Sequence, residues 1–277
     1  MSVESRASRG EEQRKGQVNM AQDIPRYSRH ELLRVIGEDG QTKIAKARVL
    51  VAGLGALGSL ISILLARAGV GMLRIVDVDA PELHNLHRQI LYDEQDTRSG
   101  LSKAQAAEQR LRLANSTVRI EAVAAAIGPG NIAQLTTGID LVVDALDNIS
   151  TRYCVNDRIL ELGIPYVFGG AVETVGNVMT IIPGKTPCLR CLWPDPYAVA
   201  DHPRASTVGV LSTAATAVAS LQVTEALKII VGREEDALAG LLVMDVWHSQ
   251  FHVAPVAPDP RCRCRMYVPH ARSQSKE

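Results

Sequence analysis

The hydrophobic positions of this chain form short apolar runs separated by longer stretches with helical spacing. We predict strands at 48–53, 72–77, 118–123, 140–145 and 165–168, where Val and Ile are frequent, and helices at 56–68, 102–114 and 150–162. Strands that alternate with helices are typical of an α/β fold with a doubly wound, mostly parallel, Rossmann-like sheet.

The pattern changes after the Gly169-Gly170 pair. The run 176–182 predicts a strand without a crossover helix before it, and 240–246 and 250–256 predict a hairpin, so we expect a small antiparallel sheet after the parallel one. A helix is expected at about 209–231. Its most apolar part contains Ser and Thr and is shorter than the ~20 residues of a membrane span. We therefore expect a buried helix and no membrane partner.

The two ends of the chain differ from the rest. Residues 1–23 and 267–277 are polar, so we expect disordered tails around one folded domain at 24–266. The 30 basic and 30 acidic residues cancel, which gives no reason to expect nucleic acid as a partner. Five cysteines without a secretion signal indicate the reducing cytoplasm.

A glycine-rich loop joins the first strand to the first long helix. Gly53, Gly55 and Gly58 have the spacing that brings backbone amides to the phosphates of a nucleotide. Asp77 ends the second strand 19 positions after Gly58, where an acidic residue binds ribose hydroxyls. These features serve ATP and NAD equally well.

Further polar residues favour a nucleotide with reactive phosphates. Two cations, Arg88 and Lys103, suit a phosphate chain on which charge develops during transfer, whereas nicotinamide needs neither. Asp147 follows the fourth strand, where a carboxylate can hold Mg²⁺. Taken singly, the cations are ordinary surface charges and Asp147-Asn148 is a helix cap. Together at strand ends, they predict a phosphoryl- or nucleotidyl-transfer site, with Asn85 and Gln89 beside them.

These motifs occur in an order that resembles a known family. The chain contains "RYSRH", "GLGALG", "NLHRQ", "SKAQ", "DALDN" with "TR" three residues further on, and "PCLRC", followed by a second cysteine pair. Over about residues 24 to 266 it is similar to the ThiF/MoeB/HesA family, relatives of ubiquitin-activating enzymes, and most similar to MoeB-type sulfur-carrier adenylyltransferases. The resemblance implies that the C-terminal Gly carboxylate of a small ubiquitin-like sulfur-carrier protein attacks the α-phosphate of MgATP. The products are an acyl-adenylate and pyrophosphate.

The resemblance also implies roles for the candidate residues. Asp77 would hold the ribose, Asp147 the magnesium, and the phosphates would be bound by Asn85, Arg88 and Lys103. Arg29 would act as an arginine finger in the partner's site of a homodimer. For this role we expect a helical arm from Pro25 to Glu38, with an apolar side formed by Leu32, Leu33 and Ile36.

No covalent catalysis is expected. The loop 201–210, in which some relatives carry a nucleophilic cysteine, contains none, and Cys154 on a predicted helix fits a small buried apolar residue. The chain also ends 13 residues after Cys264, too soon for a sulfurtransferase domain. We therefore expect a separate protein to donate sulfur.

The remaining cysteines predict a metal site. Cys188-x-x-Cys191 is half of a tetrahedral zinc site, and the resemblance implies that Cys262 and Cys264 complete a structural Zn²⁺ centre. The one-residue spacer between the second pair departs from the usual family spacing. Both sulfurs can reach one metal only if the backbone bends there. The alternative is two unrelated thiol pairs.

Three other functions remain open at this point. A relative of the same fold could adenylate a different carboxylate, in tRNA modification or on a peptide. An NAD-dependent oxidoreductase could use the same glycine loop, although Arg88, Lys103 and Asp147 argue against it. A scaffold could bind a carrier without activating it, although the motif set is complete.

Overall fold

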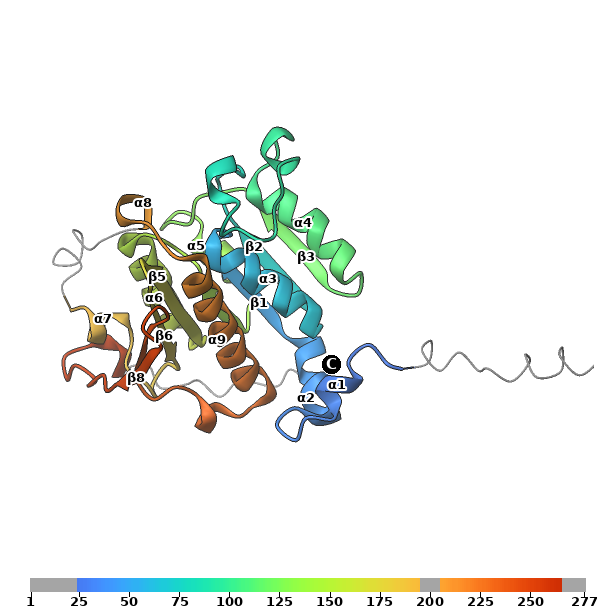
Figure 1. Ribbon diagram of the computed structural model, residues 1–277. Coiled ribbons are helices and arrows are strands. Elements are labelled where there is room, and N and C mark those ends of the chain that lie inside the picture. The colour runs from blue at the N-terminus through green and yellow to red at the C-terminus, as the bar shows by residue number, and fades with distance from the viewer. Residues whose placement is uncertain (1–23, 195–204, 266–277) are drawn as a thin grey trace, which may run out of the picture.

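The computed structural model describes residues 24–194 and 205–265 (Figure 1). Its centre is one eight-stranded sheet with the order β3-β2-β1-β4-β5-β6-β7-β8. The strands are β1 (Arg48–Ala52), β2 (Met72–Val76), β3 (Arg119–Val123), β4 (Leu141–Asp144), β5 (Tyr166–Val172), β6 (Val175–Ile181), β7 (Leu241–Asp245) and β8 (Gln250–Ala254). The helices are α1 (Ser28–Glu31), α2 (Gly37–Lys46), α3 (Ala56–Ala68), α4 (Lys103–Ala114), α5 (Ile132–Leu135), α6 (Ile149–Leu162), α7 (Leu189–Leu192), α8 (Ala205–Val208) and α9 (Ser212–Val231).

The predicted fold class is confirmed. Strands β1 to β5 pair in parallel, and β6, β7 and β8 are antiparallel. The antiparallel strands continue the parallel sheet, because β6 pairs along the whole length of β5, from Tyr166 with Ile181 to Val172 with Val175. The molecule therefore has one sheet with a parallel half and an antiparallel half.

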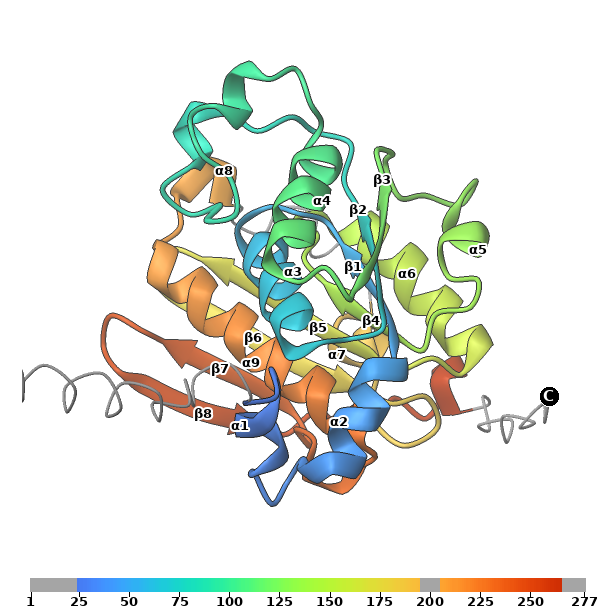
Figure 2. The same ribbon diagram turned by 90° about the vertical axis from the view of Figure 1, so that its right-hand side faces the viewer.

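Two layers of helices cover the faces of the sheet (Figures 1 and 2). One apolar core lies between the sheet and helices α2, α3, α4 and α9. The second lies on the opposite face against α5, α6 and α7 and includes Phe168, Cys188 and Cys264. Because both faces are covered, the central strands are buried along nearly their whole length, as parallel sheets require.

Helix α9 is a core helix. Among the described residues it is the one helix with the length and apolar composition of a membrane span, and half of its most apolar window is buried in the protein. The Gln222 amide, fully buried, donates to the carbonyls of Asp144 and Val167 at 2.6 and 3.1 Å. Glu225, also buried, accepts a hydrogen bond from Thr180 at 2.7 Å. These polar contacts fix α9 on the sheet and confirm the expected buried helix.

The N-terminal arm differs from the prediction. The continuous helix expected from Pro25 to Glu38 is wrong: α1 ends at Glu31, and α2 begins at Gly37, whose φ of +64° lies in the left-handed region. The arm packs at the amino ends of the strands, where the Asn115 amide donates to the Tyr27 hydroxyl at 2.8 Å. Leu32 and Leu33 remain 72% and 48% exposed.

Candidate active site

A cavity of about 710 Å³ lies at the carboxyl ends of the parallel strands. Eight of the predicted nucleotide-site residues line it: Gly53, Gly55, Asp77, Asn85, Arg88, Gln89, Lys103 and Asp147. They come from four separate chain segments, which meet because parallel strands end at the same edge of a sheet. Gly58 and Arg29 do not line the cavity. The predicted site is therefore assembled in one place, apart from these two residues.

The glycine loop packs against the turn after β4. Gly53 has φ +93°, and a side chain there would lie 2.6 Å from the Ala145 carbonyl oxygen. A Cβ on Gly58 would lie 2.0 Å from the Gly53 carbonyl oxygen, so this glycine permits close packing of helix and loop. Gly55 faces the cavity with no such backbone contact. A ligand can therefore approach the backbone at the start of α3.

Asp77 is held rigidly at the end of β2. One carboxylate oxygen accepts the Leu54 N–H at 2.7 Å, and the other accepts the Asp79 N–H at 2.9 Å. Burial raises the pKa of Asp77, and nearby Lys103 and the two backbone donors oppose this rise. The carboxylate is thus fixed in orientation and faces the cavity, as binding of a ribose diol requires.

Lys103 brings a buried ammonium group to the same cavity. It is the first residue of α4, which begins with a capping box formed by Ser102 and Gln105. Its side chain is only 6% exposed, and Nζ lies 3.0 Å from a carboxylate oxygen of Asp79. Asp79 is a partner that sequence reasoning did not assign. A buried cation with one exposed counter-ion is well placed to exchange that contact for a phosphate.

Arg88 is oriented by its neighbours. The Glu82 carboxylate accepts from the Asn85 amide at 3.0 Å, and the Asn85 oxygen accepts from the Arg88 guanidinium at 2.7 Å. Gln89 is buried beside Gly55, and its Oε1 has no hydrogen-bond partner among the residues that the structure describes. Such an unpaired buried acceptor marks a place where a ligand donor fits.

The turn after β4 separates two aspartates with different surroundings. Asp144 is fully buried, accepts the Leu146 N–H at 2.8 Å and lies 2.9 Å from Nε of Arg152. Asp147 is exposed at the cavity, and its one hydrogen-bond contact among the described residues is the Asn148 amide at 3.4 Å. The helix cap is Asn148, which accepts the Thr151 N–H at 2.9 Å. Asp147 is therefore left free of capping and available to a cation.

Sequence reasoning missed three residues that line the cavity. Arg152, from α6, donates to the Gly169 carbonyl at 2.8 Å and lies over the Phe168 ring, 4.8 Å from its centre. Trp193, which follows α7, meets Phe168 edge to face. Arg152 belongs to the motif that contains Asp147, and this was the one available signal. The two aromatic residues carry no sequence motif.

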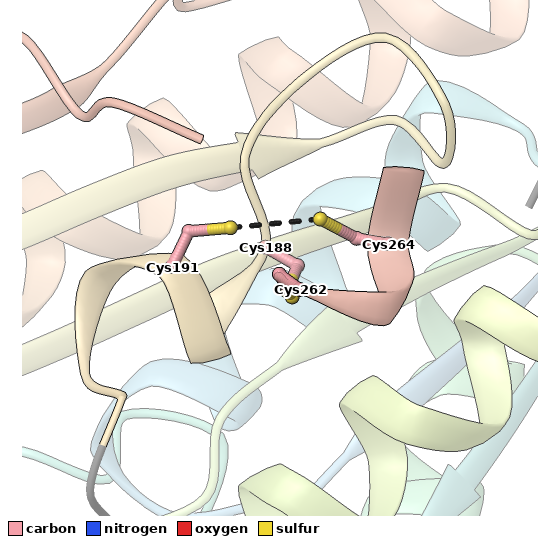
Figure 3. Close-up of side chains that lie close together, drawn as sticks. All are labelled: Cys188, Cys191, Cys262 and Cys264. Atoms are coloured by element: carbon pink, nitrogen blue, oxygen red, sulfur yellow. Dashed lines mark hydrogen bonds between the residues drawn. The ribbon is translucent and has the colours of Figure 1, made fainter. Parts of the chain in front are cut away.

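The four cysteines Cys188, Cys191, Cys262 and Cys264 form one cluster (Figure 3). Their sulfurs all lie within 4.8 Å of one another, and two pairs are 3.5 Å apart, Cys188 with Cys262 and Cys191 with Cys264. A 3₁₀ turn at Arg263–Arg265 supplies the bend that the short spacer requires. Sulfurs in a tetrahedral zinc site with ~2.3 Å bonds lie ~3.8 Å apart. The donor set fits Zn²⁺, and two unrelated thiol pairs are not observed.

The fifth cysteine has no place in the cavity. Cys154 lies half-buried on α6, and burial raises the pKa of its thiol, which lowers its reactivity at neutral pH. The expected cysteine-free loop falls partly outside the described residues, at 201–204. Among the described residues, the cavity is lined by no cysteine.

The sheet and the cavity at its carboxyl edge define a Rossmann-like α/β protein with an additional antiparallel half. Residues 27–265 match the ThiF family, and the chain belongs to this family. It is 42% identical over 228 residues to the sulfur carrier protein ThiS adenylyltransferase of Bacillus subtilis, with 81% of this chain and 66% of that protein covered. It is 37% identical to the sulfur carrier protein adenylyltransferase of Thermus thermophilus, with 87% and 90% covered.

Solved structures show the same fold. The chain superposes on E. coli MccB crystallised with ATP with a TM-score of 0.74 and 24% identity, over 87% of this chain and 74% of that one. A complex of MccB with MccA gives the same TM-score at 23% identity over the same shares of the two chains. At these identities the likeness shows the fold alone, and the ThiF family match over residues 27–265 confirms the resemblance predicted from the motifs.

Proposed function

We propose that this protein is an ATP-dependent adenylyltransferase that activates the C-terminal Gly carboxylate of a small ubiquitin-like sulfur-carrier protein. The observation that carries the proposal is the convergence of Asp77, Arg88, Lys103 and Asp147 on one cavity. Relatives that are named sulfur carrier protein adenylyltransferases support the same chemistry. The cations argue against an NAD-dependent oxidoreductase, because hydride transfer needs no charge stabilisation at a phosphate chain.

The reaction needs positioning and charge neutralisation more than a protein nucleophile. A carboxylate oxygen of the carrier attacks the α-phosphorus of ATP, and the bond to the bridging oxygen breaks, so pyrophosphate leaves with the electron pair. In our proposal Asp77 holds the ribose, the glycine loop donates backbone N–H groups to the phosphates, and Arg88 and Lys103 stabilise the leaving pyrophosphate. Asp147 would hold Mg²⁺, which supplies further charge neutralisation when bound.

The test is exchange of labelled pyrophosphate into ATP. We expect Mg²⁺-dependent exchange with a ThiS-type carrier ending in Gly-Gly, because the reverse of adenylation regenerates ATP. The same carrier without its last Gly is the matched control, and we expect it to give no exchange. Binding of NAD in place of ATP would contradict the proposal. Exchange that depends on a peptide or tRNA instead of any carrier would show that the substrate is a different carboxylate.

The proposal includes a structural Zn²⁺ held by the four-cysteine cluster. It also includes a homodimer, a separate sulfur donor protein and a cytoplasmic location. The geometry of the four sulfurs supports the zinc site. Leu32 and Leu33, exposed on the N-terminal arm, support contact with a second copy of the chain.

We infer that Arg29 acts in the partner's cavity. Its arm is tied to the amino ends of the strands by Tyr27, and the cavity lies at their carboxyl ends. Arg29 is exposed there and cannot serve its own site from this position. An arginine supplied across an interface can stabilise charge on a transferring phosphate group.

Mixing two inactive variants tests this inference. Asp147→Ala is expected to lose about 10² or more in exchange rate and Arg29→Ala at least about tenfold, since each removes a charge at the phosphates. After random subunit exchange, about half of the dimers are mixed and each has one complete site, so activity should return toward about a quarter of wild type. Arg34→Ala on the same arm is the control, and its exchange rate should be that of the wild type without mixing. A mixture that stays inactive would rule out action across the interface.

A further inference from the structure

The end of the cavity formed by β5 and β6 has an aromatic wall. Phe168 in β5 and Trp193 after α7 pack edge to face, with ring centres 5.4 Å apart and an interplanar angle of 85°. Arg152 covers the face of Phe168. All three line the cavity, and β5 lies on the opposite side of β4 from β1 and β2. Along the edge of the sheet, Asp147 therefore lies between Asp77 and this aromatic wall.

The segment that carries Trp193 is held from two sides. On one side, α6 contacts its backbone: the Asn156 side chain accepts the Leu189 N–H at 3.1 Å, and the Tyr153 hydroxyl donates to the Trp193 carbonyl. On the other side lie the cysteines, with Cys188 at the N-cap of α7 and Cys191 within it (Figure 3). Trp193 follows Cys191 by two residues.

A single helical turn does not stay ordered without such support. Helix α7 has four residues, and a helix this short is unstable by itself. The opposing cysteines, Cys262 and Cys264, come from a segment more than 70 residues away in sequence. A metal bound by all four sulfurs would therefore clamp the segment that leads to Trp193. Without metal the segment keeps its contacts with α6, the Phe168 ring and the Asp259 N–H, which donates to Cys191 Sγ at 3.4 Å, and it loses the bonds that join the four sulfurs through one ion.

The chemistry of this end suits an extended peptide rather than a nucleotide. Among the described residues β4 pairs with β5 only at Tyr166 and Val167, so the later part of β5, including Gly170, has backbone with no strand partner on the β4 side. Asn177 adds an amide, and Val172 and Val175 add apolar surface. A flat aromatic ring beside open backbone can pack over a narrow peptide end that has no side chains.

We propose that the metal-bound four-cysteine cluster holds Trp193 in the cavity wall, and that this wall binds the C-terminal residues of the acyl substrate and not the nucleotide. The inference rests on the proposed function, which assigns the Asp77 half of the cavity to ATP. Trp193 is thus a positioning residue for the substrate's tail, and metal occupancy sets the affinity for that tail.

Tryptophan fluorescence tests the link between metal and wall. The chain has two tryptophans, and Trp247 is 70% exposed in the turn between β7 and β8, so Trp247→Phe leaves Trp193 as the single reporter. Removal of zinc by a chelator should increase acrylamide quenching of Trp193 about twofold or more, with the far-UV circular dichroism unchanged. Unchanged quenching after zinc release would overturn the proposal. Loss of the dichroism signal would also overturn it, since the cluster would then support the whole fold.

Binding measurements test which ligand the wall serves. Trp193→Ala should raise the KM for a Gly-Gly carrier about tenfold and leave the Kd for ATP within twofold, with partial rescue in Trp193→Phe. Trp247→Ala is the matched control and should change neither. Equal weakening of ATP would place the wall in the nucleotide site and contradict the proposal. Quenching and ATP binding can be measured without turnover. Absence of exchange activity would refute the proposed function, and the quenching experiment would still test the link between metal binding and the position of Trp193.

Discussion

Replacement of Asp147 by Asn should lower the rate of pyrophosphate exchange by about 10² or more, because it removes the carboxylate proposed to hold Mg²⁺ against the phosphates. The stability of the fold should be nearly unchanged. Asp147 is exposed, and within the part of the chain that the structure describes its one hydrogen-bond contact is the weak one with Asn148 at 3.4 Å, so the free energy of unfolding should change by no more than ~0.5 kcal/mol. Exchange kinetics and a thermal melt on the same sample measure both quantities.

Two controls sharpen this prediction. Arg88→Ala should cause a loss of similar size, because Arg88 is proposed to stabilise the leaving pyrophosphate from the opposite wall. Asp236→Ala and Arg67→Ala remove exposed charges outside the cavity and should leave the exchange rate unchanged. If Asp147→Asn kept an exchange rate close to wild type, the magnesium role would have to pass to another residue.

Replacement of Cys188 or Cys264 by Ser should release zinc and lower the thermal midpoint by roughly 10 °C. The free energy of metal binding at a structural site adds to folding stability, and each lost kcal/mol lowers the midpoint of a domain of this size by ~2–4 °C. Both cysteines are buried in the second core, so each variant also places a hydroxyl among apolar side chains. Metal analysis and differential scanning calorimetry measure the two effects.

Cys154→Ala is the matched control, since this cysteine lies outside the cluster; it should retain about one zinc per chain. Without metal, burial raises the pKa of Cys188 to about 12, and it also raises the pKa of Cys264. Both thiols are then protonated at neutral pH, and zinc must displace these protons, so the affinity for zinc should rise with pH. A metal-free protein of full stability would contradict the structural role.

Local sequence patterns were sufficient to predict the order of the strands and of the long helices α3, α4, α6 and α9, whereas α2, α5 and α7 were not predicted. The predicted helix 56–68 coincides with α3, because its residues lie between a glycine loop and the left-handed Gly69, which ends the helix. The charged residues at the strand ends could be grouped for a general reason: the carboxyl ends of parallel strands meet at one edge. For this reason Asp77, Lys103 and Asp147 were predicted to lie together without knowledge of their contacts.

Other features depended on contacts between distant segments. The N-terminal arm was predicted as one helix, but it is interrupted between Glu31 and Gly37, where Ile36 packs against the first core. Asp144 and Asp147 belong to one motif, but Asp144 is the last residue of the buried strand β4 and pairs with Arg152, whereas Asp147 lies beyond the strand and is exposed. Helix breaks and burial of this kind depend on which segments meet in the core, and the periodicity of the sequence does not predict those contacts.

The sequence by itself determined the family, the order of the strands and the long helices, the glycine loop and the identity of the charged residues at the strand ends, because these depend on neighbours within a few positions. Only the tertiary structure decided that the two cysteine pairs meet, that Asp79 pairs with Lys103 and that Trp193 reaches the cavity. The physical reason is that these contacts join segments far apart in the chain, and they form only when the sheet topology and its two packed cores bring those segments together.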